Sequence, residues 1–331
     1  MKAWTLALGV SLALVTFGGT ASALILRPSL GSAHKALPSG AGQTPGDCIT
    51  VPHTCGFPDS TNTGVPSGTA LRSVPSQVSS GPGWHFDAKG GYVVVTVNGT
   101  VLSGLYIPGS LDIQASNVTV KDVQVVTSGA FGISLRHTTG VTIENSTISG
   151  QNSTTGRVGS AIDDVYLDST GMVIQDSNIS YFKTAIQIST GLIAGNYIHD
   201  PGYIAGDHTN GIMAVGTTEP LTIYGNTIFN DLGQTDAITL DASSSGQAVA
   251  NKTVVDNFLA GGDYTIYGGA GWNDPTSNIV IEDNRFGQRY SPKGGQYGPV
   301  AYFDPTGTGN VRSGNVWSGN VWDTTGEAIP S

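Results

Sequence analysis

The 331-residue chain has few charged residues, and those it has are mostly acidic. Only 11% of its residues are charged, and 24 Asp and Glu outnumber 14 Lys and Arg, which gives a formal net charge of -10. Nucleic acids and anionic membranes are bound chiefly through Lys and Arg, so we expect neither as a partner. Beyond the first residues no stretch approaches the ~20 apolar residues of a membrane-spanning helix, so we expect no membrane domain.

The first 23 residues have the three parts of a secretory signal peptide. Lys2 supplies the charged start, Trp4 to Phe17 the apolar centre, and Ala21-Ser22-Ala23 the small-residue cleavage site. We therefore expect residues 1–23 to be removed and the mature protein to be secreted and extracellular.

Cysteine is also scarce. The chain has two, Cys48 and Cys55, within residues 24–90, a segment rich in proline. In an exported protein such a pair most simply closes a small disulfide loop. Metal binding or a reactive thiol is the alternative, although no His/Cys cluster with zinc spacing accompanies the pair. We expect residues 24–90 to form a linker and an N-terminal cap that the disulfide staples.

From Gly91 onward the chain has the pattern of short strands. β-Branched residues dominate, as in Tyr92–Val97, and no stretch has a sustained helical period, which predicts an all-β domain over residues 91–331. A recurring isoleucine is expected to point inward in each coil, while the residue after it points outward. These isoleucines are Ile133, Ile162, Ile186, Ile212, Ile238 and Ile266.

A phrase of a strand, a small polar residue and another strand recurs between Val118 and Trp322. In its clearest copies an asparagine follows Gly or Asp, at intervals of 30, 31, 27 and 31 residues. Such a period predicts a stack of similar coils rather than a closed globular core. The asparagines are Asn196, Asn226, Asn257, Asn284 and Asn315.

Coils of this kind, with asparagine at a tight turn and an inward aliphatic stack, resemble the pectate-lyase-like superfamily over roughly residues 91 to 323. The resemblance implies a single-stranded right-handed parallel β-helix (solenoid), with turn asparagines stacked along its axis. Ser146 and Ser177 hold the same place in earlier coils, so the asparagine ladder is expected to be incomplete there. Superfamily members generally bind polysaccharide along the strands that precede this turn.

Two phrases are similar to the catalytic phrase of polygalacturonases. They are Thr209-Asn210-Gly211-Ile212 and Thr235-Asp236-Ala237-Ile238, and only the second keeps the acid. The Gly-His-Gly and Arg-Ile-Lys phrases of polygalacturonases are absent, so we do not assign pectin hydrolysis.

The outward residues of this face supply the candidate site. We expect Asp207 and Asp236, in neighbouring coils, to form the acid/base pair of a glycoside hydrolase, with His208 and Asp163 as alternates. No metal or other cofactor is expected for hydrolysis. The residues expected to bind the sugar chain are Asn210, Gln187, Asp241, Tyr264, Tyr267 and Tyr302.

Two other functions stay open. A uronate polysaccharide lyase would hold Ca²⁺ through carboxylates, but basic residues to abstract the proton are scarce near this face. A non-catalytic glycan-binding or surface module would use the same tyrosines, together with Trp272, as stacking platforms. In each case the expected partner is a polysaccharide, and the protein is expected to be monomeric.

Overall fold

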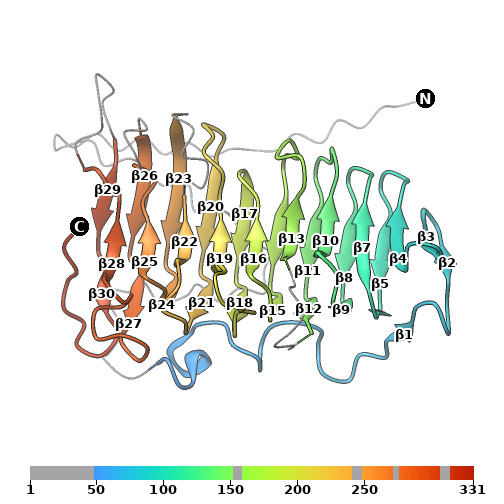
Figure 1. Ribbon diagram of the computed structural model, residues 1–331, viewed down its shortest axis with the longest axis horizontal. Helices are drawn as coiled ribbons and strands as arrows, with labels where there is room; N and C mark the ends of the chain where they lie inside the picture. The colour runs from blue at the N-terminus through green and yellow to red at the C-terminus, as the bar shows by residue number, and fades with distance from the viewer. Residues whose placement is uncertain (1–47, 152–158, 241–247, 271–275, 306–313) are drawn as a thin grey trace, which may run out of the picture. The chain divides into compact units, whose positions relative to one another are not determined.

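Strands β4 to β30 follow one another along the chain in groups of three, and each member of a group joins a different sheet (Figure 1). The computed structural model describes residues 48–151, 159–240, 248–270, 276–305 and 314–331. The expected signal peptide and the first part of the expected linker lie outside these residues. All neighbouring strands from β4 onward pair in parallel, one coil above the next, as a coiled chain requires.

The first sheet carries the column of isoleucines. In spatial order it contains β2 (Ser80–Gly81), β3 (Trp84–Asp87), β4 (Tyr92–Val95), β7 (Ser110–Ile113), β10 (Phe131–Leu135), β13 (Ser160–Asp164), β16 (Thr184–Gln187), β19 (Asn210–Met213), β22 (Asp236–Thr239), β25 (Tyr264–Tyr267) and β28 (Gly298–Ala301).

The second sheet follows the first within each coil. It contains β5 (Val101–Ser103), β8 (Thr119–Lys121), β11 (Thr142–Glu144), β14 (Val173–Gln175), β17 (Gly191–Ala194), β20 (Leu221–Tyr224), β23 (Val249–Val255), β26 (Thr276–Glu282) and β29 (Val316–Ser318).

The third sheet completes each coil. It contains β1 (Arg72–Ser73), β6 (Leu105–Ile107), β9 (Gln124–Thr127), β12 (Thr147–Gly150), β15 (Asn178–Ser180), β18 (Tyr197–His199), β21 (Thr227–Asn230), β24 (Phe258–Gly261), β27 (Arg285–Gly287) and β30 (Val321–Trp322). The all-β prediction is confirmed, and three parallel sheets are consistent with a β-helix solenoid.

The isoleucine column is stacked in register in the first sheet. Ile186 pairs with Ile212 and Ile212 with Ile238, and all are fully buried. Since side chains alternate along a strand, the residues on either side of each isoleucine lie on the opposite face. The sequence therefore predicted correctly which residues line the interior.

Turns between the second and third sheets are held together by a ladder of buried asparagines. The backbone amide and Nδ2 of Asn226 both donate to Oδ1 of Asn257, at 2.9 and 3.0 Å, and Asn196 bonds to Asn226 in the same way. The residue before each rung has a positive φ, as Asp256 does at 56°, which explains why Gly, Asp and Asn alternate there.

Both ends of this ladder differ from the prediction. Ser177 and Ser146 continue it, because their hydroxyl oxygens accept the backbone amides that an asparagine oxygen would accept. At the other end the rung is Asn320, which bonds to Asn284. Asn315, in the last copy of the repeated phrase, instead precedes β29 and bonds to Ile279 and Thr276, so this copy of the phrase is not a rung of the ladder. The final coil is longer, so the rung Asn320 lies 36 residues after Asn284, whereas Asn315 lies 31 residues after it.

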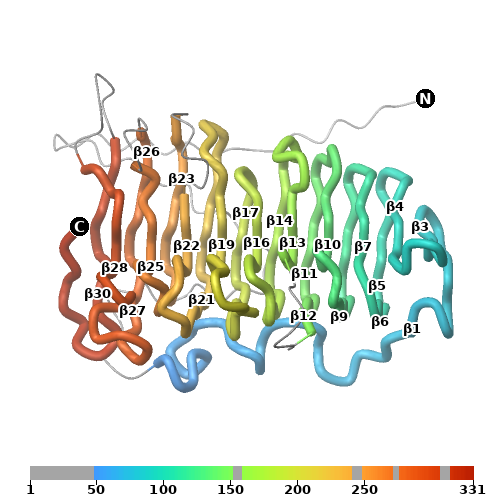
Figure 2. Tube along the Cα trace, in the orientation of Figure 1, coloured from blue at the N-terminus to red at the C-terminus, as the bar shows by residue number. Residues whose placement is uncertain are grey.

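The segment from Cys48 to Ser73 runs along the third sheet from the last coils to the first ones (Figure 2). It begins with the 3₁₀ helix η2 (Pro52–Cys55), whose Cys55 is disulfide-bonded to Cys48. Phe57 then packs on Phe258 of β24, the amide of Gly64 bonds to the Asp176 carbonyl, and β1 pairs with β6. The predicted disulfide is confirmed, and its position against the last coils is a finding of the structure.

One lysine is enclosed within the solenoid. Lys252 of β23 occupies the inward position between Leu221 and Ile279 and is fully buried. Its ammonium group donates to the Ser189 carbonyl at 2.8 Å, to Thr217 Oγ1 at 3.0 Å and to the Glu219 carbonyl. Burial lowers the pKa of Lys252 to about 8, and the Glu219 carboxylate partly opposes the shift.

Candidate functional site

The outward residues of the first sheet form a column, as the sequence predicts, because the pairing is in register. Asp163 pairs with Gln187, Gln187 with Met213, and Thr239 with Tyr267. A second column runs from Ser160 through Thr184, Asn210 and Asp236. Neighbouring rungs of such columns are ~4.8 Å apart.

Much of this face is covered. Asp163, Asn210 and Asp236 are buried, whereas Gln187, Tyr264 and Tyr267 are partly exposed and Tyr302 is 50% exposed. The accessible aromatic part therefore lies on the last coils. Asp241 lies outside the described residues, as does Trp272, which the sequence suggested as a further stacking ring.

Four tyrosines form a connected group on these coils, which we call the tyrosine row: Tyr264, Tyr267, Tyr297 and Tyr302. The ring centroids of Tyr264 and Tyr267 are 5.7 Å apart, those of Tyr264 and Tyr297 are 5.8 Å apart, and Tyr267 stacks on Tyr302 at 5.7 Å with an interplanar angle of 24°. Tyr297 and Tyr302 are 56% and 50% exposed. Large exposed apolar surface of this kind usually marks a binding site.

Next to the tyrosine row lies a buried acid, Asp236, whose carboxyl group has no hydrogen-bond partner among the described residues. Both carboxyl oxygens of Asp236 are shielded from solvent, and neither has a hydrogen-bond partner in the described part of the chain. Burial, and then the charge of Asp263, raise the pKa of Asp236 well above its usual range. Burial and the Asp236 charge likewise raise the pKa of Tyr267 to about 12, so this acid and this tyrosine lie close together.

The turn before Asp236 is fixed by a buried asparagine. Nδ2 of Asn230 donates to the carbonyl oxygens of Gln234 at 2.7 Å and of Asp236 at 3.0 Å, and it also contacts Thr209. Thr235 is held at φ 42°, which is strained for a β-branched residue. Such strain persists only where the surrounding bonds impose it.

His208 and Asp263 flank this turn. Nδ1 of His208 is 3.2 Å from Oγ1 of Thr235, and the His208 side chain is exposed. Asp263 is half-buried, and its backbone amide donates to the Thr235 carbonyl at 3.0 Å. Burial raises the pKa of the Asp263 carboxyl group, and the nearby His208 opposes that shift.

Asp207 has a partner within its own loop. One of its carboxyl oxygens accepts the backbone amide of Ile204 at 3.1 Å, and its own amide donates back to the Ile204 carbonyl. This is the geometry of a carboxylate that closes a turn. The pairing of Asp207 with Asp236 as acid and base stays a prediction.

Asp163 belongs to a different cluster, nearer the first coils. Burial raises its pKa, while a hydrogen bond from Ser160 lowers it. Its column neighbour Ser134 bonds to Asp112, and Arg136 donates from Nε to the same carboxylate at 2.6 Å. Gln187 and Asn210 continue the columns between this cluster and the tyrosine row.

Two members of the site were missed by sequence reasoning. Asp263 follows Thr235 by one coil and precedes Tyr264, so alignment of the coils at Ile238 and Ile266 would have pointed to it. Tyr297 lies in a long insertion before β28, and the amide that joins it to the Asp263 carbonyl is visible only in three dimensions.

No group of three or more His, Cys, Asp or Glu side chains that could hold a metal ion occurs within the described ranges. Those ranges also include no helix long and apolar enough to cross a membrane. Comparisons with protein families, with curated proteins and with solved structures found no match to this chain.

Proposed function

We propose that the protein binds a polysaccharide along the tyrosine row. The observation that supports this most is the chain of ring contacts through Tyr297, Tyr264, Tyr267 and Tyr302, two of whose members are at least half exposed. Tyrosine offers a flat apolar ring with a hydroxyl at its tip, which suits the C–H faces and hydroxyl groups of sugars. Because the chain carries a net charge of -10, a neutral glycan is favoured over a polyuronate.

The remaining expectations belong to the same proposal. We infer that the coils wind right-handed as in the pectate-lyase-like superfamily, that the segment before Gly91 serves as the N-terminal cap, and that the protein is exported to the extracellular space. The disulfide Cys48–Cys55 supports export, because disulfides persist in oxidising compartments.

Affinity electrophoresis in gels that contain neutral or uronic polysaccharides tests the binding proposal. We expect retardation by a neutral polysaccharide, and we expect Tyr267→Ala and Tyr302→Ala each to weaken it about fivefold, in line with ~1 kcal/mol for a lost ring contact. Tyr166→Ala is the matched control, since Tyr166 is 52% exposed but belongs to the cluster near the first coils. Equal losses in all three variants, or no retardation of the wild type, would exclude the proposal.

Hydrolysis of the bound glycan is the second candidate. Asp236 has the raised pKa that a general acid needs, and Asp263 is the carboxylate whose charge contributes to that shift. We therefore propose Asp263, rather than only Asp207, as a partner for Asp236. Asp236 is fully covered, so hydrolysis requires a movement that exposes its carboxyl group, whereas binding requires none; binding is for this reason the first proposal.

Release of reducing ends from the retained polysaccharide tests this second candidate. Asp236→Asn should abolish activity, and Asp263→Asn and Asp207→Asn decide which carboxylate is the partner. If ultraviolet absorbance of an unsaturated uronide appears and chelator removes it, the protein is a Ca²⁺-dependent lyase. If no reducing ends form while binding persists, it is a binding module.

A further inference from the structure

A cleft of about 300 Å³ opens beside the turn that carries Asp236. Its walls are the turn after β21, with Asp231 and Gly233, the glycine pair Gly261-Gly262 at the end of β24, and the insertion after β27, with Tyr290 and Gln296. A volume of this size is at the lower end of small-molecule sites and holds a single sugar unit.

The cleft has fixed walls. In the insertion, Oγ of Ser291 donates to the Gly295 carbonyl at 2.7 Å, and the amide of Gln296 donates to the Gly262 carbonyl at 2.8 Å. Gly261 donates to the Gly294 carbonyl at 3.0 Å, which ties the glycine pair to the same insertion. The wall formed by the turn after β21 is fixed as well, because Nδ2 of Asn230 donates to the Gln234 carbonyl at 2.7 Å. The site is therefore formed before any ligand arrives, which lowers the entropy cost of binding.

Glycine is required where these walls meet. A Cβ at Gly261 would lie 1.6 Å from the carbonyl oxygen of Asn230, and Gly261 also has φ 87°. No other residue fits there without moving the backbone.

The polar groups of the cleft suit a neutral, hydroxyl-rich ring. Gln296 is exposed, and its side-chain amide makes no hydrogen bond to any described residue. The Tyr290 hydroxyl likewise makes none within the described part of the chain. The Tyr290 ring packs edge-on against Phe229, with ring centroids 6.0 Å apart. Burial, and then the neighbouring Asp200 carboxylate, raise the pKa of the Asp231 carboxyl group. The Asp231 carboxyl group at the wall disfavours an anionic ligand, while an amide, a phenol and a carboxyl group together can both donate and accept.

Cleft and tyrosine row are joined through consecutive residues. Gln296 lines the cleft and Tyr297 belongs to the row, and Gly262 lines the cleft and precedes Asp263. Cα atoms of consecutive residues are only 3.8 Å apart. Cleft and row therefore adjoin along the backbone, and the inference places the next units of a sugar chain in the cleft.

We propose that this cleft is a second subsite, which takes a neutral glycosyl unit of the polysaccharide that lies on the tyrosine row. The inference rests on the proposed binding function. It adds where the sugar chain extends beyond the tyrosine row, and it adds that the unit bound in the cleft is uncharged. Gln296, Tyr290 and Asp231 are the residues that hold the unit.

Isothermal titration with neutral oligosaccharides of increasing length, from the β-glucan, mannan, xylan and galactan series, tests the subsite. In the wild type, affinity should rise with length and then level off when both row and cleft are filled. The double variant Tyr290→Phe with Gln296→Ala keeps the ring contact with Phe229 and removes the two free polar groups. We expect it to lose about tenfold for the longest oligosaccharides and nothing for the shortest.

Lys293→Ala is the control, because Lys293 is exposed in the same insertion but does not line the cleft. If the double variant binds every length as the wild type does while Tyr267→Ala still loses affinity, the subsite is refuted and the binding proposal survives. If the wild type binds none of the four series, both are refuted.

Discussion

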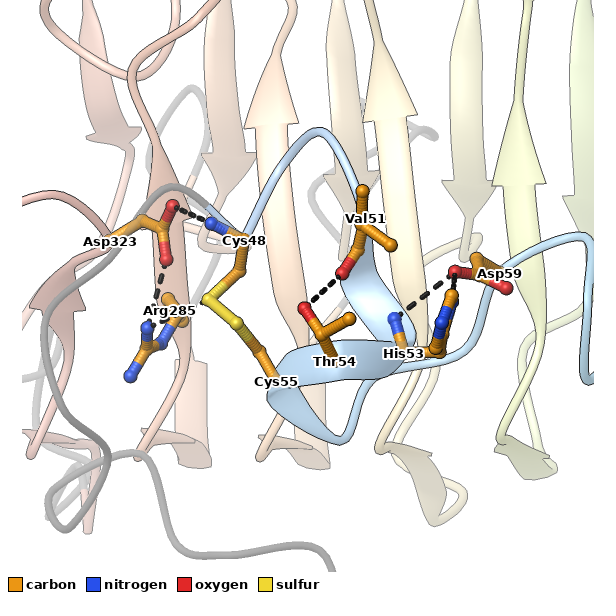
Figure 3. Close-up of a disulfide and its surroundings, with 8 residues drawn as sticks. All are labelled: Cys48, Val51, His53, Thr54, Cys55, Asp59, Arg285 and Asp323. Atoms are coloured by element: carbon orange, nitrogen blue, oxygen red, sulfur yellow. Dashed lines mark hydrogen bonds and ion pairs between the residues drawn. A yellow bond between two sulfur atoms is a disulfide. The ribbon is translucent and has the colours of Figure 1, made fainter.

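The backbone amide of Cys48 donates a hydrogen bond to Oδ2 of Asp323, 2.9 Å away and 275 residues later in the chain. Oδ1 of the same carboxylate accepts Nη1 of Arg285, also at 2.9 Å, and all three residues are buried (Figure 3). A single carboxylate thus joins the start of the segment along the third sheet to the last coils of the solenoid.

Removal of that carboxylate should destabilise the protein strongly. Asp323→Ala leaves the Arg285 guanidinium buried without its counter-ion, and breaking a buried pair in this way costs about 3–5 kcal/mol. Urea unfolding of both proteins measures the difference. In the double variant Asp323→Ala with Arg285→Met the buried charge is gone as well, so most of the loss should be recovered. A double variant no more stable than Asp323→Ala would contradict this account.

The disulfide should contribute less than that carboxylate. Cys48 and Cys55 are seven positions apart, and closing so short a loop stabilises a folded chain by about 2–3 kcal/mol through the unfolded state. We expect the double variant Cys48→Ser with Cys55→Ser to lose this amount in urea unfolding. Because the chain has no other cysteine, reduced wild type serves as an internal check and should match the variant.

The asparagine ladder should be sensitive in its middle. Asn226→Ala removes the side-chain oxygen that accepts the Asn196 amide and the Nδ2 group that donates to Asn257 Oδ1 and to the Ile193 carbonyl, all in buried positions. Unsatisfied buried groups cost about 1–3 kcal/mol each, so a loss of at least 2 kcal/mol is expected in urea unfolding, roughly the penalty of two such groups. Asn98→Ala is the control: Asn98 accepts one amide at an exposed turn, and its loss should be within about 0.5 kcal/mol.

Asp236 should make stability fall as the pH rises. Because its pKa in the folded state is raised well above 3.8, the folded protein keeps a proton that the unfolded chain loses over the range between those two values. Its contribution is therefore complete below pH ~4 and decreases above that pH. Asp236→Asn should match the wild type at pH ~4 and be more stable at pH ~7. Thermal unfolding at both values checks this, and a variant whose stability differs from that of the wild type by the same amount at both pH values would contradict it.

Lys252 should make the stability rise with pH in the alkaline range. Its pKa of about 8 in the folded state is below the usual 10.5, so between these values the unfolded chain binds the proton and the folded protein does not. Stability therefore gains a positive slope with pH in this window. Lys252→Met keeps the length of the side chain and should remove that slope, which is read as the difference between variant and wild type in urea unfolding from pH ~7 to ~10. Parallel profiles would show that the lysine titrates normally.

Much of the scaffold could be predicted because it repeats. A pattern such as Gly225-Asn226 or Asp256-Asn257 reports a local requirement, a positive φ followed by a side chain that bonds to the next coil, and each copy reinforces the others. Asn315 shows the limit, since Gly314-Asn315 has the same letters at the expected spacing, and only the bonds of Asn320 reveal the true rung.

Less of the candidate site could be predicted. The outward position of Tyr267, one residue after Ile266, follows from strand periodicity, and the structure places Tyr267 in register with Thr239. Asn210 and Asp236, two residues before Ile212 and Ile238, are buried, which the expectation of outward side chains did not include. Asp263, Tyr297 and the cleft at Gln296 arise where an insertion bonds to a neighbouring coil, a contact that no local pattern encodes.

The sequence by itself determined the all-β class, the direction in which each strand residue points and the residues of the turns, because each depends on neighbours within a few positions. Only the tertiary structure decided that Cys48 meets Asp323, that Asp236 is buried with no hydrogen-bond partner among the described residues, and that a cleft adjoins the tyrosine row. Those features depend on which distant segments share space, and that is set when the coils stack and the remaining segments pack onto them.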